Sequence, residues 1–359
     1  MHNNIAEEGC SQRFITFGEI MLRLTPPNYE KIRMTASFEA SYGGSEANVA
    51  LALANLGIDS SFFTVVPNNS LGKSAVRMLR SNDVHCSPII LSTPEETPTH
   101  RLGTYYLETG YGIRPSKVTY DRKYSAITEY DFSKVDLDEL LDGFTWLHLS
   151  GITPALSVSC ADFMLKCLQK AKEKGITVSF DGNFRSTLWT WEEAREFCTK
   201  CLPYVDVLLG IEPYHLWRDE NDHSKGDVKD GIPMQPRYEQ QDEVFQAFAA
   251  RYPNIKCMAR HVRYAHTGSE NSLMAYMWYE DHTFESRLFT FNILDRVGGG
   301  DAFASGLIYA MMKGYKPMDM INFAVASSVI KHTIRGDGNI TDDADSIRSL
   351  MNMNYDIKR

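Results

Sequence analysis

Short, nearly continuous apolar runs alternate along the chain with longer segments in which apolar residues recur every three or four positions. The short runs predict buried strands, and the longer segments predict helices. We expect strands at residues 14–24, 61–66, 146–150, 175–180, 205–209, 255–259, 272–279, 284–291 and 288–294. We expect helices at residues 49–56, 71–80, 157–174, 191–202, 244–252, 302–313, 318–331 and 343–351.

From residue 146 onward, strand and helix follow each other in a regular rhythm. This rhythm predicts an α/β fold, with a doubly wound, mainly parallel sheet flanked by helices. Ligands of such sheets bind beyond the carboxyl ends of the strands. No repeat or linker interrupts the pattern, so we expect a single domain over residues 14–345.

Residues 97–130 have a different pattern, because polar and apolar side chains alternate at His100–Glu108 and again at Ser116–Arg122. Half-exposed strands of this kind do not belong inside a parallel sheet. We therefore expect a small antiparallel β lid, with strands inserted at about 20–40 and 97–130. Its tyrosines and arginines are placed to close over a polar ligand; a surface hairpin without a ligand role is the alternative.

Composition narrows the class of protein. The chain has 359 residues, of which 43% are hydrophobic and 23% charged, as in soluble globular proteins. A net charge of -9 without a basic run argues against nucleic-acid binding, and no apolar stretch reaches membrane-spanning length. Residues 1–12 are polar and acidic, so we expect a short disordered tail rather than a secretory signal. Seven scattered cysteines favour a reduced, cytoplasmic protein.

Two local patterns imitate functional motifs. Residues 67–74 resemble a phosphate-binding Walker A loop, but Pro67 replaces the first glycine and removes an N–H group. Cys198 and Cys201 have Cys-x-x-Cys spacing, but they fall within an expected helix and no second pair follows. The ten histidines show no metal-ligand spacing. We interpret none of these residues as a site.

The stretch from Asp295 to Gly306 lies between an expected strand and an expected helix. Its three consecutive glycines allow a sharp turn and a close approach to a ligand. The following helix offers free N–H groups and a positive dipole end, which suit phosphate or another anion. Asp301 is placed to take a proton from a hydroxyl that attacks a phosphoryl group. Alternatively, Asp301 is only a helix N-cap and the glycines only a tight turn.

Two further turns carry candidate binding residues. Gly43 and Gly44 lead into a helix that contains Asn48, although a glycine pair before a helix is common. Asn183 and Arg185 follow the expected strand at 175–180 and are placed to meet a ligand. The planar guanidinium of arginine matches a carboxylate or phosphate.

Together, these separated motifs resemble the ribokinase-like (PfkB) family of sugar kinases, from about residue 14 to residue 345. Within that family the chain looks most like the 2-keto-3-deoxygluconate kinases. The resemblance is carried by Gly43-Gly-Ser-Glu-Ala-Asn48, Arg114-Pro-Ser-Lys-Val-Thr-Tyr-Asp-Arg122, Asp181-Gly-Asn-Phe-Arg-Ser-Thr-Leu-Trp189 and Asp295-Arg-Val-Gly-Gly-Gly-Asp301.

The resemblance implies a ribokinase-like domain with a β lid, and an ATP-dependent carbohydrate kinase that uses Mg²⁺. Asp301 would be the catalytic base, within an anion hole formed by Gly298, Gly299 and Gly300. The substrate-binding residues would be Gly44, Asn48, Tyr105, Tyr120, Arg122, Asn183 and Arg185, and the ATP-binding residues would be Arg263 and Gly268.

The chain departs from the family pattern at two places. The usual Asp-Thr before the glycines is Asp295-Arg296, a variant associated with the keto-deoxygluconate branch. The Asn-x-x-Glu motif that helps organise Mg²⁺ in many relatives is not intact in residues 209–214, where Glu212 is the remaining acid and the candidate metal ligand.

The expected reaction is phosphorylation of the terminal hydroxyl of a sugar acid, with 2-keto-3-deoxygluconate converted to its 6-phosphate. Arg122 and Arg185 favour an anionic substrate, because a neutral sugar needs no buried guanidinium. The alternatives are a kinase for a neutral sugar such as fructose or ribose, and a non-catalytic sugar or nucleotide sensor on the same fold. The expected partners are the sugar acid and ATP, together with a second copy of the chain paired through exposed lid edges.

Overall fold

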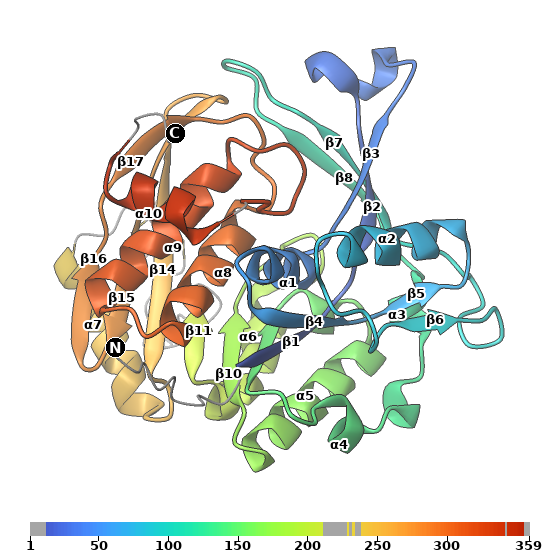
Figure 1. The fold of residues 1–359 in the computed structure, drawn as a ribbon, viewed down its shortest axis with the longest axis horizontal. Helices are drawn as coiled ribbons and strands as arrows, with labels where there is room; N and C mark the ends of the chain where they lie inside the picture. Colours follow the sequence, from blue (N-terminus) through green and yellow to red (C-terminus); the bar gives the residue numbers. More distant parts are fainter. Residues whose placement is uncertain (1–11, 211–227, 230–231, 234–237, 342, 355–359) are drawn as a thin grey trace, which may run out of the picture.

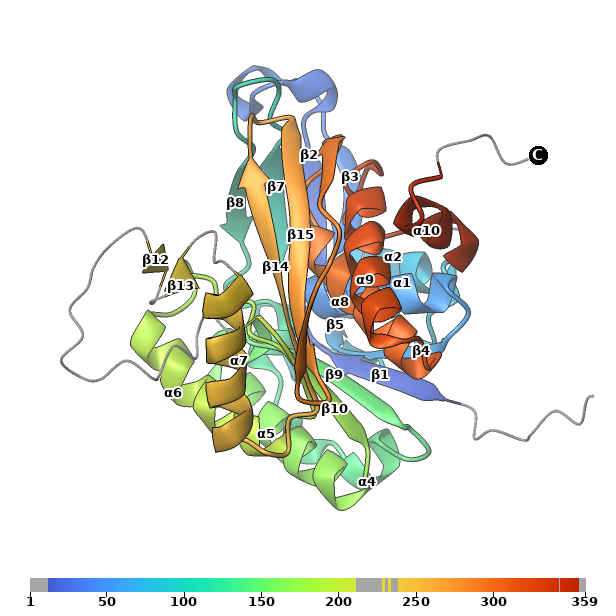
Figure 2. The ribbon, with the colours of Figure 1, turned by 90° about the vertical axis from the view of Figure 1, so that its left-hand side faces the viewer.

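The computed structural model describes residues 12–210, 228–229, 232–233, 238–341 and 343–354, and its main body is one large sheet between two layers of helices (Figures 1 and 2). This nine-stranded sheet runs in the order β16-β15-β14-β11-β10-β9-β1-β4, and β17 also pairs with β15. Its strands are β1 (Arg13–Phe17), β4 (Asp59–Phe63), β9 (Trp146–Ser150), β10 (Thr177–Asp181), β11 (Val207–Leu209), β14 (Cys257–Ala265), β15 (Glu270–Tyr279), β16 (His282–Glu285) and β17 (Phe289–Asn292).

The pairing is parallel from β4 through β14 and antiparallel from β14 to β17. Strands such as β9 and β11 are buried along their whole length, which explains their continuous apolar sequence. The predicted doubly wound, mainly parallel sheet is therefore confirmed. The carboxyl ends of its central strands all open toward the same edge, where Asp181 ends β10.

Helices cover both faces of the sheet (Figure 2). One face packs against the apolar core formed with α1, α8 and α9, and the other against a second core formed with α5, α6 and α7. The helices are α1 (Ser45–Asn55), α2 (Ser70–Arg80), α3 (Ala126–Glu129), α4 (Leu137–Leu140), α5 (Val158–Glu173), α6 (Trp191–Cys201), α7 (Tyr238–Arg251), α8 (Gly299–Met312), α9 (Pro317–Lys331) and α10 (Ala344–Met351).

A separate four-stranded sheet stands over one edge of the body, near the top of Figure 1. It consists of β2 (Met21–Thr25), β3 (Glu39–Gly43), β7 (Thr104–Glu108) and β8 (Lys117–Asp121), in the order β3-β2-β7-β8. Each hairpin is antiparallel, and the two hairpins meet in a parallel pair of β2 and β7. We call this sheet the lid. Two minor pairs, β5 (Val65–Pro67) with β6 (Ile90–Ser92) and β12 (Val228–Lys229) with β13 (Ile232–Pro233), complete the strands.

The expected single strand at 14–24 is wrong, because the chain leaves the main sheet after β1 and enters the lid at β2. The break contains Glu19, which is 3% exposed and accepts hydrogen bonds from Arg122 and Ser125 of the lid segment. An expected strand at 61–66 likewise divides into β4 and β5. The run at 284–291 divides into β16 and β17, where the Ser286 hydroxyl accepts a hydrogen bond from the Ala275 N–H group.

The two imitated motifs are ordinary structural elements. Cys198 and Cys201 are both buried within α6. The Walker-like segment 67–74 instead begins α2, whose N-cap is Asn69. The predicted tail at 1–12 lies almost wholly outside the described residues.

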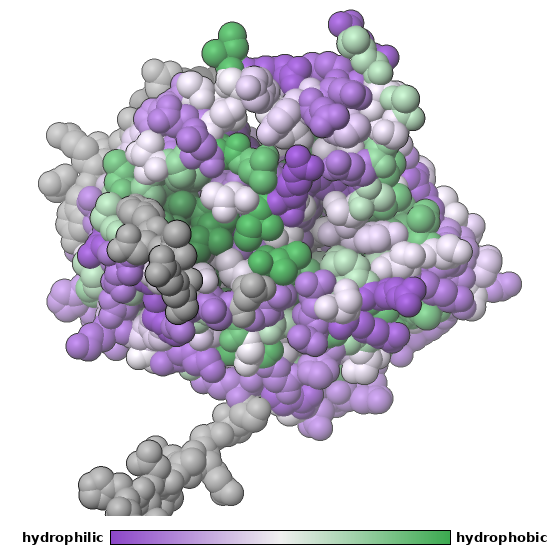
Figure 3. All heavy atoms as spheres, turned by 45° about the horizontal axis from the view of Figure 1, so that its top comes forward, coloured by the Kyte–Doolittle hydropathy of each residue, from purple (hydrophilic) through white to green (hydrophobic). Residues whose placement is uncertain are grey.

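Figure 3 shows hydrophobic side chains near the middle of one face, with hydrophilic residues around them. Among the described residues, no helix combines the length and apolar character needed to span a membrane.

Candidate active site

A cavity of about 550 Å³ lies between the lid and the carboxyl ends of the central strands. The lid lines it with Tyr105, Val118, Tyr120 and Arg122. The strand ends contribute Asp181, Leu209 and Arg260–Arg263, and the N-termini of α1 and α8 contribute Gly44–Glu46, Asn48 and Gly298–Asp301. Four parts of the chain that are distant in sequence thus meet at the edge where a doubly wound sheet binds its ligands.

The three glycines of the turn before α8 differ in how much room the structure leaves for a side chain. Gly298 has a left-handed φ of 82°, and a Cβ there would overlap the carbonyl oxygen of Asp337. A Cβ at Gly299 would overlap the His332 ring, whereas one at Gly300 would meet only His261, at 3.8 Å. Gly298 is the N-cap of α8, so the first N–H groups of the helix have no intrahelical acceptors and lie at the cavity wall, where that of Gly299 donates to the Arg296 carbonyl at 3.4 Å. This geometry suits an anion.

Asp301, in the first turn of α8, is partly buried at the cavity wall. Its Oδ1 accepts a hydrogen bond of 2.7 Å from the Ser45 hydroxyl, and its Oδ2 accepts one of 2.7 Å from the Asn48 side-chain amide. Burial raises the pKa of Asp301 above its ordinary value, while these two hydrogen bonds and the charge of Arg185 oppose the rise. Asp301 is not a side-chain N-cap of its helix, because no side-chain cap is present there.

The 181–185 turn joins the same network. Asn183 has a positive φ of 38°, and its backbone N–H group donates to Asp181 Oδ1 at 3.0 Å. Its side-chain amide donates to the Ser45 hydroxyl at 2.8 Å. Ser45 therefore links Asn183 to Asp301. Arg185, at the cavity rim, is exposed and forms no ion pair with another described residue.

The lid residues that line the cavity differ in how firmly other side chains hold them. The Arg122 guanidinium is paired with the Glu19 carboxylate, to which its Nε donates at 2.8 Å. The Tyr105 hydroxyl donates to Asp337, so burial and this carboxylate raise its pKa. The Tyr120 ring lies 5.7 Å from the Tyr105 ring and is 43% exposed. Tyr120 is therefore the freer of the two rings to contact a ligand.

Two guanidinium groups share the wall near β14. Partial desolvation and the charge of Arg296 lower the pKa of Arg263, and desolvation lowers the pKa of Arg296. The buried Nε of Arg296 has no hydrogen-bond partner. Like charges held together in this way favour an anion placed between or beside them.

Glu46, in the first turn of α1, is the most buried acid of the cavity wall, at 1% exposed. Burial raises its pKa from 4.5 to about 7, although Thr153 and Ser150 donate hydroxyl hydrogen bonds of 2.7 Å to its Oε1. Near neutral pH this carboxyl group is therefore a mixture of its two protonation states.

Most of the predicted site residues come together in this cavity. Its wall includes Gly44, Asn48, Tyr105, Tyr120, Arg122, Asn183, Arg185, Arg263, Gly298, Gly299, Gly300 and Asp301. Gly268 lies apart from it, in the turn between β14 and β15, against the carbonyl groups of Gly112 and Arg114. Glu212 lies outside the described residues. Within the described ranges, no group of three or more histidines, cysteines or acids is arranged to hold a metal ion.

Sequence reasoning missed Ser45, Glu46 and Arg296 as parts of the wall. All three lie inside motifs that the sequence analysis quoted, next to residues it selected. Their positions within two residues of a glycine were the available signal. Asp337 was missed for another reason, since its short Gly-Asp-Gly segment has no distinctive spacing.

Comparisons with known proteins identify the family. Residues 11–213 match the model of the pfkB family carbohydrate kinases. A 2-dehydro-3-deoxygalactonokinase of Haloferax volcanii is 31% identical over 90% of this chain and 92% of its own length. A 2-dehydro-3-deoxygluconokinase of Bacillus subtilis is 26% identical over 90% of each chain. The crystal structure of a 2-dehydro-3-deoxygluconokinase from Thermotoga maritima matches with a TM-score of 0.86 and 36% identity, over 95% of this chain and 99% of that one.

Proposed function

We propose that this chain, which belongs to the pfkB family of carbohydrate kinases, transfers the terminal phosphoryl group of ATP to the terminal hydroxyl of a 2-keto-3-deoxy sugar acid. The proposed product of 2-keto-3-deoxygluconate is its 6-phosphate. The single observation that carries the proposal is Asp301, held by Ser45 and Asn48 beside the glycine turn of an arginine-lined cavity.

Asp301 is the proposed general base. Its carboxylate is fixed by two donors, so its remaining lone pairs are free to accept the proton of the substrate hydroxyl. Removing that proton as the oxygen attacks phosphorus makes the hydroxyl a stronger nucleophile. The raised pKa makes this carboxylate a better proton acceptor than an exposed aspartate.

The turn at Gly298–Gly300 and the N-terminus of α8 are the proposed anion hole. Charge on the transferred phosphoryl group would meet backbone N–H groups of the cavity wall at the start of α8. Because Gly298 and Gly299 are held against Asp337 and His332, these donors need little reorganisation during the reaction.

Arg185 is the proposed partner of the sugar-acid carboxylate. It reaches the cavity from the 181–185 turn and has no competing ion pair among the described residues. The charge of Arg122 is already neutralised by Glu19. Its proposed roles are therefore to shape the lid side of the cavity and to donate hydrogen bonds to substrate hydroxyls. Tyr105, Tyr120, Asn183 and Gly44 complete this proposed sugar side.

Arg263 and Arg296 are the proposed contacts of the ATP phosphates. Their mutual repulsion in the free protein would be relieved by a polyphosphate, and the unpartnered Nε of Arg296 would gain an acceptor. Gly268 lies outside the cavity wall, so we keep it only as a proposed contact of the outer nucleotide. Mg²⁺ is proposed to enter with the ATP phosphates, which bind it with few protein ligands. Glu212 remains the proposed acid for it.

A substrate screen tests this proposal. The purified protein is supplied with ATP and one of five acceptors: 2-keto-3-deoxygluconate, 2-keto-3-deoxygalactonate, 5-keto-2-deoxygluconate, fructose or ribose. We expect ADP release with the first two acceptors and little with the neutral sugars. Faster turnover of fructose or ribose would overturn the sugar-acid assignment. Binding of sugar acid and ATP without any ADP release would favour the sensor alternative.

A further inference from the structure

Lys331, the last residue of α9, has a side chain that is completely buried. Lys331 does not line the active-site cavity, and its ammonium group contacts the segment that leads into the glycine turn. Nζ donates to the carbonyl oxygen of Asp295 at 3.2 Å and to the carbonyl oxygen of Ile334 at 3.2 Å. Burying an unpaired ammonium group is energetically costly. The position of Lys331 therefore requires a compensating arrangement around it.

Compensation comes from a compact charge cluster. Burial lowers the pKa of Lys331 overall, and Asp295 and Asp337, which are 3% and 4% exposed, oppose this lowering. Arg23 of the lid bridges these two acids with hydrogen bonds of 2.5 and 2.6 Å. Two carboxylates thus face two cations, and the buried cluster has no formal net charge.

The two carbonyl groups that accept hydrogen bonds from Lys331 belong to two segments of the chain, the one that enters the glycine turn and the one that packs against it. Asp295 begins the turn, and Ile334 begins the segment that reaches Asp337, whose carbonyl packs against Gly298. Backbone bonds tie these segments together, because the Leu294 and Asp295 N–H groups both donate to the His332 carbonyl. Lys331 adds a side-chain connection between the same segments.

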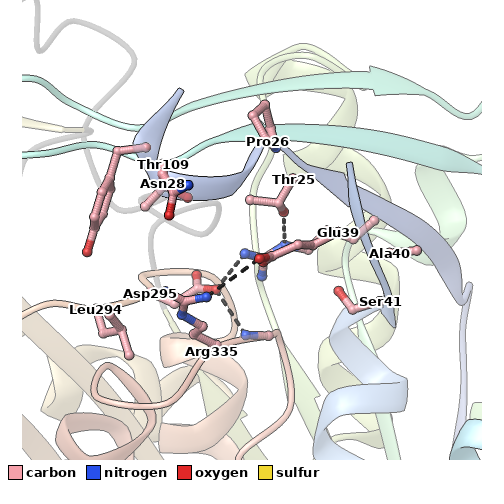
Figure 4. A pocket seen from close by; sticks show the side chains of 13 residues that line it. Thr25, Pro26, Asn28, Glu39, Ala40, Ser41, Thr109, Leu294, Asp295 and Arg335 are labelled. Carbon is pink, nitrogen blue, oxygen red and sulfur yellow. Dashed lines mark hydrogen bonds and ion pairs between the residues drawn. The ribbon is translucent and has the colours of Figure 1, made fainter. Parts of the chain in front are cut away.

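Two cavities adjoin the chain where it enters the glycine turn. Arg296 lines the active-site cavity, and a second cavity of about 220 Å³ is lined by Asp295, Leu294, Arg335 and lid residues (Figure 4). Packing and hydrogen bonds hold the turn, since Gly298 lies against the Asp337 carbonyl and the Gly299 carbonyl accepts a hydrogen bond of 2.7 Å from the Ser328 hydroxyl. Lys331 adds a buried ionic contact where the chain enters the turn.

We propose that Lys331 is a positioning residue that serves as a built-in monovalent cation for the glycine turn. Its ammonium group takes the place that an alkali ion would occupy between backbone carbonyls, and it keeps the N–H groups of Gly298–Gly300 aimed at the phosphoryl group. The proposal rests on the proposed function, because it assigns a task to the anion hole. A direct consequence is that the enzyme needs no added potassium, sodium or ammonium ion.

The test compares three variants at Lys331 with wild type. Lys331→Met keeps the alkyl volume and removes the charge, Lys331→Gln keeps one donor, and Lys331→Ala leaves a cavity; Lys316→Met, at an exposed lysine, is the control. We expect kcat to fall about 10- to 100-fold in Lys331→Met, less in Lys331→Gln and not at all in the control, because small displacements of catalytic groups are costly. The KM values for sugar acid and ATP should change much less.

Chemical rescue provides the readout that separates positioning from general destabilisation. Ammonium or potassium chloride should restore part of the kcat of Lys331→Ala, and tetramethylammonium chloride at equal ionic strength should not. Wild-type activity should be the same in all three salts. Unchanged kcat in a folded Lys331→Met variant, or a wild-type requirement for potassium, would overturn the proposal.

Hydrogen exchange of the peptide spanning residues 294–301 distinguishes failure of this inference from failure of the proposed function. Faster exchange in Lys331→Ala, slowed again by ammonium, supports the restraint even if wild type phosphorylates none of the sugar acids. Unchanged exchange, with wild-type turnover intact, refutes the restraint alone. If Lys331→Met does not fold, the exchange and kinetics of Lys331→Gln decide the matter in the same way.

Discussion

The side-chain amide of Asn48 lies 2.7 Å from Oδ2 of Asp301, although 253 positions separate the two residues. Asn48 belongs to α1 and Asp301 to α8, so this bond joins the N-terminal ends of two helices at the cavity wall. The second oxygen of Asp301 is held by Ser45, from the same turn of α1. The proposed base is therefore oriented by the first helix of the chain and carried by a helix near its end.

Replacing Asp301 by asparagine should remove the base while preserving the shape of the side chain. Proton abstraction by a positioned group contributes about 10²- to 10⁴-fold, so we expect a fall in kcat of that order. Binding of ATP and of the sugar acid, measured by calorimetry, should remain. Asp142→Asn, at an exposed position, is the matched control. Normal ADP release by Asp301→Asn would exclude Asp301 as the base.

The hydrogen bonds to Asp301 should set the acid limb of the pH–rate profile. The base works only when ionised, so kcat/KM should fall as the pH drops through the pKa of Asp301, which burial places above its ordinary range. Asn48 and Ser45 lower this pKa by donating to the charged form. Asn48→Ala should therefore raise the pKa and move the acid limb to higher pH. A limb that stays in place, or moves to lower pH, would contradict this assignment.

The three glycines of the turn should respond differently to the same added methyl group. An alanine at position 298 would have to adopt a left-handed φ, and its Cβ would overlap the Asp337 carbonyl. For Gly298→Ala we therefore expect at least a tenfold loss of kcat and a lower melting temperature. Gly300→Ala finds ordinary contact distance to His261, so it should fold and keep most of its activity. Parallel melting curves and ADP-release assays check the contrast. Equal damage by both substitutions would show that the turn adopts a different geometry during catalysis.

Local sequence patterns predicted the elements well because each depends on its own residues. The predicted helix at 71–80 and the observed α2 (Ser70–Arg80) differ by one residue, and α6 ends one residue before the predicted boundary. The long apolar run at 14–24 failed because its division depends on Glu19, whose partners Arg122 and Ser125 lie about a hundred positions away. Periodicity carries no information on such a partner.

The same distinction explains the candidate site. Asp301, Gly298 and Arg185 lie in compact motifs, so the sequence and its resemblance to a kinase family could select them as candidates, and all three line the cavity. Ser45 contacts Asp301 across 256 positions, and Lys331 contacts Asp295 across 36. Serine and lysine are common residues, and only the folded arrangement distinguishes these two from the others in the chain.

Arg185 should determine the preference for an acidic substrate. Arg185→Ala should raise the KM for 2-keto-3-deoxygluconate by about 10- to 100-fold, since a charge-assisted hydrogen bond contributes about 1.5–3 kcal/mol. The KM for ATP should change little, because the proposed phosphate contacts are other residues of the cavity wall, Arg263 and Arg296. Arg77→Ala, at an exposed arginine of α2, is the control. An unchanged sugar-acid KM would remove the main physical support for that substrate class.

Glu46 should make the folded protein less stable as the pH rises. Burial raises the pKa of its carboxyl group from 4.5 to about 7, so between these values the folded state holds a proton that the unfolded chain has released. The free energy of unfolding therefore falls through this window, by about 3 kcal/mol once the pH exceeds the folded pKa.

Glu46→Gln keeps an acceptor for the Ser150 and Thr153 hydroxyls but cannot ionise. Relative to wild type, the variant should gain up to about 3 kcal/mol on going from pH 5 to pH 8, which urea denaturation at a series of pH values measures. Glu139→Gln, at an exposed glutamate, should leave the pH slope unchanged. If Glu46→Gln and wild type have the same slope, Glu46 ionises at its ordinary pKa, and the buried wall beside Asp301 is more hydrated than its geometry indicates.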